Sequence, residues 1–217
     1  MNDNRVRHAI TALALATLVL TASPAHAAEG TPLAVTLGPG SVLWLEGTSN
    51  VHDFESRSKE VQIEFSGNPG AAQPTDAAAI LALIRSSAVH GVLVKVAVNS
   101  LRSDKEGLDK RLRKAMQAEE YANVAFSLKQ YVLSPSRAGD DTVAIQAEGS
   151  LAIAGRELPI SLEARAYRAA EGVWLEGSET LLMSDYGIKP PRMMLGTLRV
   201  RDPITVRYRL FLIPKGK

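Results

Sequence analysis

The stretch T-L-R-V-R-D-P-I-T-V-R-Y-R-L-F-L at residues 197–212 decides the fold of this chain. Its apolar side chains recur at every second position, at Leu198, Val200, Ile204, Val206, Tyr208, Leu210 and Leu212. Arginines and threonines fill the positions between them, at Thr197, Arg199, Arg201, Thr205, Arg207 and Arg209. Successive side chains of a β-strand point to opposite faces of a sheet, whereas a helix would spread these arginines around its whole surface. The stretch therefore predicts a long antiparallel strand with an apolar inner face and a cationic outer face.

One dipeptide interrupts this alternation. Asp202 falls on the apolar side of the strand, and Pro203 follows it directly. Proline has no backbone N–H to donate to a neighbouring strand, so it is confined to strand edges and bulges. We therefore expect a β-bulge or an edge position at Asp202-Pro203.

Seven further segments have the composition and alternation of strands. They are Ser41–Glu46, Glu55–Phe65, Val89–Leu101, Val124–Leu133, Thr142–Ile153, Leu158–Tyr167 and Val173–Leu182. Most of them are long, and short hairpin-type turns join most of them in sequence. Such a pattern indicates a barrel rather than a sandwich, and closing a barrel also removes exposed strand edges. We expect an all-β, eight-stranded antiparallel barrel with one or two short helices.

Two segments between the strands predict helices. Asp76 to Ser87 is rich in alanine and leucine, with Thr75 or Asp76 as its N-cap. Ser103 to Glu106 has the pattern of a capping box, which opens a second helix that runs to about Tyr121. The second helix has an apolar stripe at Leu108, Leu112, Ala115 and Met116. This stripe suits a helix that plugs or flanks a sheet, and the basic residues outside it leave open a helix that faces a membrane.

The overall composition excludes several classes of protein. The chain of 217 residues has 25 Lys and Arg against 23 Asp and Glu. A nucleic-acid-binding protein usually has a concentrated basic excess, which this chain lacks. Cysteine is absent, so the chain has no disulfide, no thiolate nucleophile and no metal site with cysteine ligands.

The N-terminal segment has the features of an export signal. Arg5 and Arg7 precede an apolar run from Ala9 to Ala22, and Ala25-His26-Ala27 forms an A-x-A cleavage site. The run is shorter than the ~20 residues that a membrane span needs, which disfavours a permanent anchor. We expect residues 1–27 to be a signal peptide cleaved after Ala27. Residues 28–217 would then form one mature barrel domain, located in the periplasm or secreted.

The inner face of the barrel determines what the protein can hold. Its expected residues are small or medium aliphatic ones, at Val92, Val94, Val96, Val98, Leu198, Val200, Ile204 and Val206. Aromatic residues make up only 5% of the chain, which is little material to fill a barrel. Two interpretations stay open here, an apolar cavity that takes a slender ligand and a core filled by aliphatic side chains.

Five stretches, in order along the chain, resemble the YceI-like family of exported bacterial proteins. They are L-W-L-E-G-T-S-N-V-H-D-F at 43–54, V-A-V-N-S-L-R-S at 96–103, L-D-K-R-L-R-K-A-M-Q-A-E-E-Y-A-N-V-A-F-S-L at 108–128, G-S-L-A-I-A-G at 149–155 and M-S-D-Y-G-I-K-P-P at 183–191. The segment from Pro69 to Ser87 is longer than the first connection of that family. The resemblance implies a lipocalin-like barrel whose long cavity takes an isoprenoid tail.

Several residues are candidates for contact with such a ligand. We expect the cavity and its opening to involve Trp44, His52, Phe54, Val94, Val96, Val200, Val206 and Tyr208. His52, beside Asp53, would meet a ligand head group or hydrogen-bond at a strand kink. A zinc site with His90 is disfavoured, because the two histidines lack ligand-like spacing.

The sequence shows no catalytic constellation. It has no G-x-S-x-G elbow, no H-E-x-x-H motif and no phosphate-binding loop. We therefore expect a binding protein without catalytic residues, resident metal or cofactor, which holds a polyprenoid or quinone-type lipid, or another long apolar ligand, for carriage or sequestration. Transient contact with a membrane or membrane protein fits this role, and the oligomeric state is left open. The alternative is a ligand-free periplasmic stress or interaction protein with a filled barrel.

Overall fold

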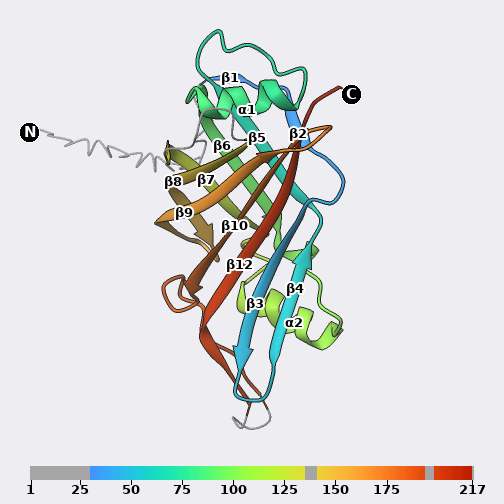
Figure 1. Cartoon of the computed structure of the whole chain (residues 1–217). Helices are drawn as coiled ribbons and strands as arrows, with labels where there is room; N and C mark the ends of the chain where they lie inside the picture. Colours follow the sequence, from blue (N-terminus) through green and yellow to red (C-terminus); the bar gives the residue numbers. More distant parts are fainter. Residues whose placement is uncertain (1–29, 135–140, 194–197, 217) are drawn as a thin grey trace, which may run out of the picture.

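The computed structural model describes residues 30–134, 141–193 and 198–216. Its elements are β1 (Thr31–Pro32), β2 (Val35–Leu37), β3 (Val42–Ser49), β4 (Asp53–Ser58), β5 (Val61–Gly67), α1 (Ala77–Arg85), β6 (Val89–Ala97), a 3-10 helix (Val98–Ser100), α2 (Glu106–Ala115), β7 (Asn123–Leu133), β8 (Thr142–Ile153), β9 (Arg156–Arg168), β10 (Val173–Leu182), β11 (Arg192–Met193) and β12 (Leu198–Pro214). The main antiparallel sheet has the order β1-β5-β6-β7-β8-β9-β10-β12-β3-β4, and β2 and β11 also pair with β12. Figure 1 shows this sheet curled about a long axis, with the two helices toward opposite ends. The expected all-β antiparallel barrel with short helices is confirmed.

The number of strands differs from the expected eight, because the main path through the described residues has ten. The segment Glu55–Phe65 was expected to be one strand, but it is divided into β4 and β5. The hydroxyl of Ser58 accepts a hydrogen bond from the backbone N–H of Glu60 at 3.0 Å, which stabilises a turn there. The short strand β1, paired with the end of β5, is the second addition.

The alternation in β12 is confirmed over the described residues; Thr197 lies outside them. Val200, Ile204 and Val206 face the interior, and Arg207 and Arg209 face outward. The pairing of β12 with β3 shifts register between Val200 and Ile204, which confirms a bulge around Asp202-Pro203.

Asp202 avoids the apolar interior by binding a neighbouring turn. Its carboxylate accepts hydrogen bonds from the backbone N–H of Ser184 at 2.9 Å and from the Ser184 hydroxyl at 2.6 Å. The bulge therefore turns this acidic side chain toward a polar partner.

The curled sheet is closed differently at its two ends. Near α1, β1 pairs with β5 and β2 pairs with β12, so residues 31–37 connect the two sides of the sheet. Near α2, β4 and β5 do not pair with each other, and one bridge joins Arg57 to Arg102 through backbone hydrogen bonds of 2.8 and 2.9 Å. The barrel is therefore completed at each end by a few local contacts rather than by one continuous ladder.

The two helices differ in how they begin. Asp76 caps α1 as predicted, because its side chain accepts a hydrogen bond from Ala79 N–H at 2.8 Å. The predicted capping box of α2 is wrong. The Ser103 hydroxyl donates to Asp109 at 2.6 Å instead of capping with Glu106, and α2 begins at Glu106. It also ends at Ala115, well before Tyr121, because Gln117 takes a left-handed φ of 51°.

The interior is packed near its two ends. One cluster of buried side chains gathers at α1 and includes Ile80, Leu81, Ile84, Val143 and Leu212. The other gathers beyond β6 and includes Val98, Leu101, Met116, Tyr186 and Ile188. Inward-facing residues between the clusters, such as Val94 and Val206, are only half-buried. The middle of the barrel is therefore incompletely filled by side chains.

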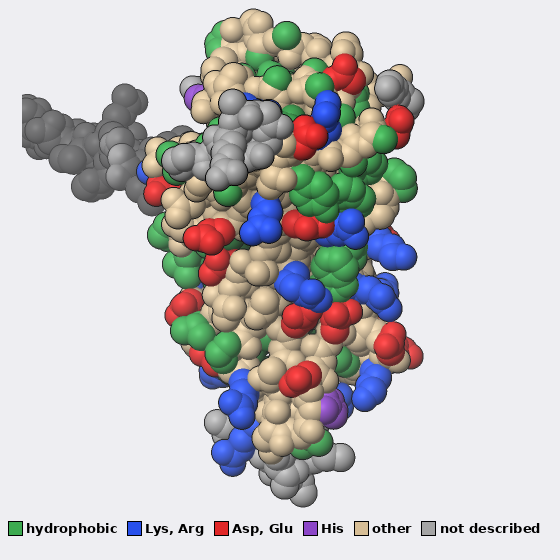
Figure 2. All heavy atoms as spheres, in the orientation of Figure 1, with side chains coloured by type: hydrophobic (Ala, Val, Ile, Leu, Met, Phe, Trp, Pro, Cys, Tyr) green, Lys and Arg blue, Asp and Glu red, His purple; other side chains and the backbone are tan. Residues whose placement is uncertain are grey.

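Two arginines on the outer face of β12 are ion-paired. Arg207 forms an ion pair with Glu46 and a longer one with Glu55, and Arg209 pairs with Glu176 at 2.9 Å. Figure 2 shows acidic and basic side chains interspersed across this face. Such pairing gives the exposed surface mixed charge, which is typical of a protein in water.

The N-terminal prediction falls outside the structure described here. Residues 1–27, the expected signal peptide, precede the described residues, so its cleavage stays a prediction. Within residues 30–134, 141–193 and 198–216, no helix combines the length and apolar character needed to cross a bilayer.

Candidate functional site: an apolar cavity in the barrel

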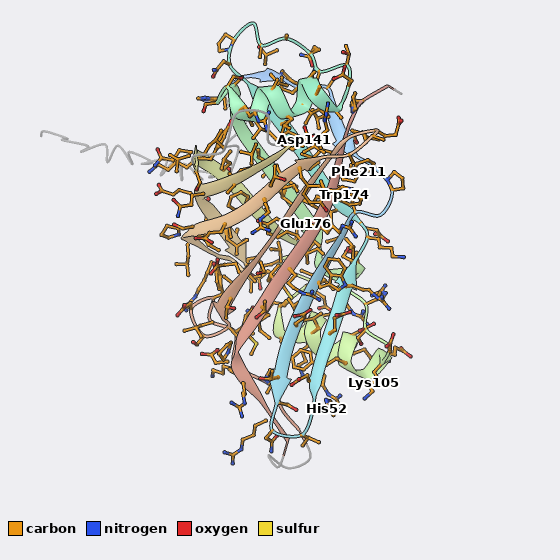
Figure 3. All side chains as sticks on the ribbon, in the orientation of Figure 1. His52, Lys105, Asp141, Trp174, Glu176 and Phe211 are labelled. Atoms are coloured by element: carbon orange, nitrogen blue, oxygen red, sulfur yellow. The ribbon has the colours of Figure 1, made fainter. Side chains whose placement is uncertain are left out.

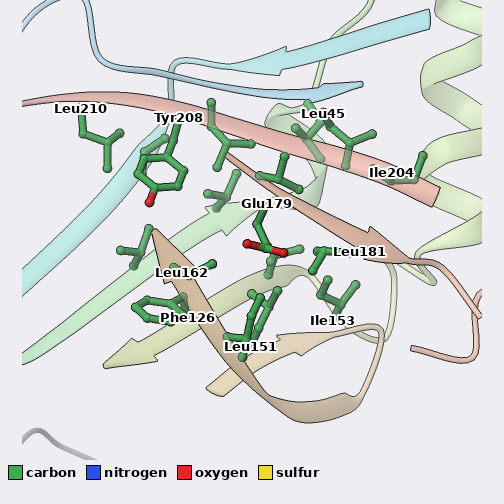
Figure 4. Close-up of a pocket in the computed structure, with 18 of the residues that line it drawn as sticks. Leu45, Phe126, Leu151, Ile153, Leu162, Glu179, Leu181, Ile204, Tyr208 and Leu210 are labelled. Carbon is green, nitrogen blue, oxygen red and sulfur yellow. The ribbon is translucent and has the colours of Figure 1, made fainter. Parts of the chain in front are cut away.

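The candidate site is the hollow between the two packed clusters. It has a volume of about 290 Å³, close to the lower end of the ~300–1,000 Å³ that ligand pockets usually have. Its walls come from strands β3 to β10, from β12, and from both helices. Figure 4 shows aliphatic side chains from several of these strands pointing into the same space. The cavity is suited to hydrocarbon.

The period-two pattern of the strands builds these walls. Val92, Val94 and Val96 line the cavity from β6, and Val200, Ile204, Val206, Tyr208, Leu210 and Leu212 line it from β12. Each set occupies alternate positions of one strand, and such positions share one face of a sheet. The apolar stripe of α2 also faces the cavity, since Leu108, Leu112, Ala115 and Met116 all line it. This geometry confirms the interpretation of α2 as a helix that flanks the barrel interior.

Three aromatic side chains of the cavity lie against glycines of neighbouring strands. A Cβ atom at Gly47 would come 2.8 Å from Cε1 of Phe54, and one at Gly177 would come 2.5 Å from Cζ of Tyr208. A Cβ atom at Gly149 would likewise come 2.7 Å from the ring of Phe126. The missing side chains let the rings lie close to the wall, which is known to stabilise glycine in sheets. These three pairs keep aromatic bulk out of the centre of the cavity.

Two ionic side chains line the cavity in the part of the chain that the structure describes. Arg111 is exposed on α2, whereas Glu179 extends inward from β10. Figure 4 shows the Glu179 carboxylate among aliphatic side chains that include Leu162 and Leu181. Glu179 therefore places a polar group within an otherwise apolar wall.

Tyr208 has an unusual environment for a phenol. Burial raises its pKa, and the negative charge of Glu179 raises it further, to about 12. Its hydroxyl donates to the backbone carbonyl of Glu163 at 3.4 Å. At neutral pH Tyr208 is therefore a neutral hydrogen-bond donor directed at the wall of the barrel.

The structure brings together six of the eight predicted ligand residues. Phe54, Val94, Val96, Val200, Val206 and Tyr208 all line the cavity. Their contact with a ligand stays a prediction.

The other two predicted residues, Trp44 and His52, lie outside the cavity lining. Trp44 packs on the outer face, where the guanidinium carbon of Arg207 lies 5.2 Å from its ring centroid. His52 is exposed in the turn between β3 and β4, as Figure 3 shows, and its Nδ1 lies 3.1 Å from the carbonyl oxygen of Asp53. Trp44 follows the outward parity of β3, since the inward positions are Leu43 and Leu45. The alternation therefore separates Trp44 from Phe54, and a role of either Trp44 or His52 in binding stays a prediction.

A metal centre is not apparent in the described residues. Among them, no three His, Cys, Asp or Glu side chains are grouped so that they could hold a metal ion.

Sequence reasoning did not identify Glu179, Phe126 or the three cavity glycines. A signal for the glycines was present, because Gly47, Gly149 and Gly177 each take an inward position on a strand. Glycine inside a strand often marks a close approach of another group. Glu179 also had a signal, since it shares the parity of Leu175 and Leu181 on β10.

The fold has counterparts among solved structures. A polyisoprenoid-binding domain from Saccharophagus degradans, described as implicated in plant cell wall breakdown, matches with a TM-score of 0.57 and 12% identity. The match covers 84% of this chain and 99% of that one. BcnA of Burkholderia cenocepacia matches with a TM-score of 0.56 and 15% identity, over 79% of this chain and 94% of that one. At such low identity these likenesses show a shared fold.

The sequence also matches the model of a known protein family. The model of the YceI-like domain matches residues 41–211, which covers most of the chain. No curated protein matches the chain significantly.

Proposed function

The chain belongs to the YceI-like family, and from this membership and the hollow barrel we propose that it binds an isoprenoid lipid. The tail of the lipid, of the polyprenoid or quinone type, would lie in the cavity. The solved polyisoprenoid-binding domain with the same fold supports this choice of ligand.

The observation that carries the proposal is the apolar hollow of about 290 Å³. A lipid tail that buries about ten carbons gains ~8 kcal/mol at ~0.8 kcal/mol per methylene. Association costs at least ~4 kcal/mol in lost freedom of motion, which leaves a useful net affinity for longer tails. The side chains that line the cavity walls are mostly aliphatic, so the cavity suits a long hydrocarbon better than a compact polar molecule.

The alternative of a ligand-free protein with a filled barrel fits the structure less well. The side chains inside the barrel pack tightly only in the clusters near its two ends, and the middle of the barrel is hollow. Catalysis has no comparable support, because no nucleophile is hydrogen-bonded to a basic side chain among the described residues of the cavity wall.

We further propose that the protein is exported and carries the lipid through an aqueous compartment. The N-terminal segment, with its A-x-A site at residues 25–27, supports export. A long-tailed lipid is insoluble in water, so a barrel that encloses the tail would make it transferable. Loading and release would then involve transient contact with a membrane.

The direct experiment is lipid extraction and native mass spectrometry of the full chain purified from its source. We expect a bound lipid with an isoprenoid mass, and uptake of added polyprenol or quinone by protein stripped of lipid. Cell fractionation of the same culture tests export, and loss of residues 1–27 from the exported form tests cleavage.

A matched pair of variants separates cavity binding from surface adhesion. Val206→Trp fills the cavity from its wall and should abolish the lipid adduct. Val132→Trp adds the same side chain on β7, where Val132 is 59% exposed, and should leave the adduct unchanged. Absence of an adduct and of uptake in the unmodified protein would refute lipid binding, and an unaffected adduct in Val206→Trp would move the site elsewhere.

A further inference from the structure

Glu179 is the acidic side chain of the cavity wall in the described residues, and its position follows from the fold. It faces inward from β10 because it shares the parity of Leu175 and Leu181, which also line the cavity. Its cross-strand neighbour on β12 is Val206, another cavity residue. The carboxylate therefore lies in the wall that a bound tail would contact, as Figure 4 shows.

The protein supplies no partner for this carboxylate within the described residues. The outward-facing Glu176 on the same strand is paired, since it accepts from Tyr167 at 2.7 Å and binds Arg209 at 2.9 Å. Among residues 30–134, 141–193 and 198–216, no side chain forms a hydrogen bond or ion pair of this kind with Glu179. The nearby Tyr208 hydroxyl donates to the Glu163 carbonyl instead.

The backbone pairing of β10 also changes beside Glu179. Pairing of β10 with β9 ends at Gly177 and Ala164, so Glu179 lies beyond the last pair. From that point β10 continues against β12 alone.

An unpartnered carboxylate in an apolar wall is unfavourable unless a hydrogen-bond donor compensates it. A hydrocarbon tail alone has no donor, and an anionic group would be repelled. An ammonium group would have to shed strongly bound water before it could approach the carboxylate. A hydroxyl group supplies a donor at a smaller cost of desolvation.

We propose that Glu179 determines the specificity of the cavity by accepting a hydrogen bond from a hydroxyl group of the lipid. The site would thus take a long-chain alcohol and reject a lipid that places a carboxylate or phosphate at this depth. This inference rests on the proposed lipid-binding function and names the chemical class of its ligand.

The test compares probes that share one dodecyl chain: dodecanol, dodecanoate and dodecylammonium. Each is titrated against the full chain loaded with the neutral fluorophore N-phenylnaphthylamine, and displacement gives relative affinities. In the unmodified protein we expect dodecanol to bind about tenfold more tightly than dodecanoate, a difference of ~1.4 kcal/mol. Dodecylammonium should also bind less tightly than dodecanol.

Two isosteric variants assign the preference to one residue. Glu179→Gln removes the charge and adds an amide donor, so the dodecanol-to-dodecanoate ratio should fall to near unity. Glu64→Gln makes the same change at an exposed, outward position of β5 and should keep the ratio of the unmodified protein. Uptake of the fluorophore by both variants shows that the cavity is intact.

The outcomes distinguish this inference from the proposed function. If neither the fluorophore nor any dodecyl probe binds the unmodified protein, both proposals fail. If the probes bind but Glu179→Gln leaves the ratio unchanged, or if dodecanoate or dodecylammonium binds best, the hydroxyl-specific role of Glu179 fails and lipid binding stands.

Discussion

The phenol ring of Tyr208 occupies the space that a side chain on Gly177 would need. The two residues are cross-strand partners on β12 and β10, and a Cβ atom at Gly177 would lie 2.5 Å from Cζ of Tyr208. This arrangement lets the tyrosine lie along the wall and reach the Glu163 carbonyl, just beyond the last pair of β9 with β10. A glycine therefore shapes the cavity as much as the aromatic residue does.

Gly177→Ala should consequently disturb both the wall and the cavity. Extra atoms in a packed site cost about 1–3 kcal/mol, and the displaced ring would move toward the hollow. We expect a lower denaturation midpoint in urea and weaker binding of N-phenylnaphthylamine. Gly107→Ala is the control, because a Cβ atom there meets only Arg111 Nη1, at 3.8 Å. In an exposed helix this control should gain up to about 1 kcal/mol. Equal stability of Gly177→Ala and the unmodified protein would contradict the prediction.

Asp109 should contribute more to stability than Glu106. Asp109 is only 4% exposed and accepts hydrogen bonds from the backbone N–H and the hydroxyl of Ser103, at 2.8 and 2.6 Å. Asp109→Ala removes the acceptor of the Ser103 N–H and leaves the Ser103 hydroxyl only the Lys105 carbonyl, at 3.0 Å, so we expect a loss of about 1–3 kcal/mol in urea unfolding. Glu106 makes an exposed ion pair with Lys110, and Glu106→Ala should cost less than ~0.5 kcal/mol. Similar losses for the two variants would refute this difference.

The raised pKa of Tyr208 predicts a loss of stability at high pH. Its pKa is about 12 in the folded protein against 10.0 ordinarily. As pH rises from 10 toward 12, the unfolded chain loses this proton while the folded chain keeps it, so the free energy of unfolding falls. The difference of about two units corresponds to ~3 kcal/mol.

Tyr208→Phe should therefore show a flatter pH dependence of stability. Urea unfolding at about pH 9 and about pH 11.5 measures this slope in both proteins. Tyr131, Tyr167 and Tyr186 also have raised pKa values, and they contribute equally to both proteins. Identical slopes would show that the Tyr208 proton is not held more tightly in the folded state.

Phe54 and Trp44 offer a test of which face of the sheet the proposed lipid would contact. Phe54→Ala removes a ring from the cavity wall, so we expect altered affinity for a dodecyl probe. Trp44→Ala removes the cation–π contact with Arg207, worth about 0.5–1 kcal/mol at an exposed site, and should leave probe affinity within about twofold. Fluorophore displacement measures affinity, and urea unfolding confirms that both variants fold. A larger effect of Trp44→Ala on affinity would place the lipid on the outer face.

Much of the barrel was predictable because strand alternation reports directly on which side chains face inward. The apolar positions of β12, the valines of β6 and the bulge beside Pro203 all follow from period two and the chemistry of proline. Local patterns also predicted the Asp76 cap of α1.

Two errors in the predicted secondary structure arose where the hydroxyl of a serine forms a hydrogen bond that the sequence pattern did not suggest. Ser103 could cap with Glu106, but its hydroxyl donates to the buried Asp109 instead. Ser58 seemed to continue a strand, yet its hydroxyl accepts from Glu60 and ends β4 there. Neither preference is visible in spacing alone, because each depends on contacts that form only after folding.

The interruption between β4 and β5 bears on how thick a ligand the proposed binding cavity could accept. A fully laddered barrel has a fixed girth, since widening it breaks hydrogen bonds along a whole strand. Here the circumference is held near α2 by the Arg57–Arg102 bridge and a 2.7 Å contact between the Ser58 and Ser100 hydroxyls. If these few bonds were released, β4 would separate from residues 100–102 while every ladder of the main sheet stayed intact.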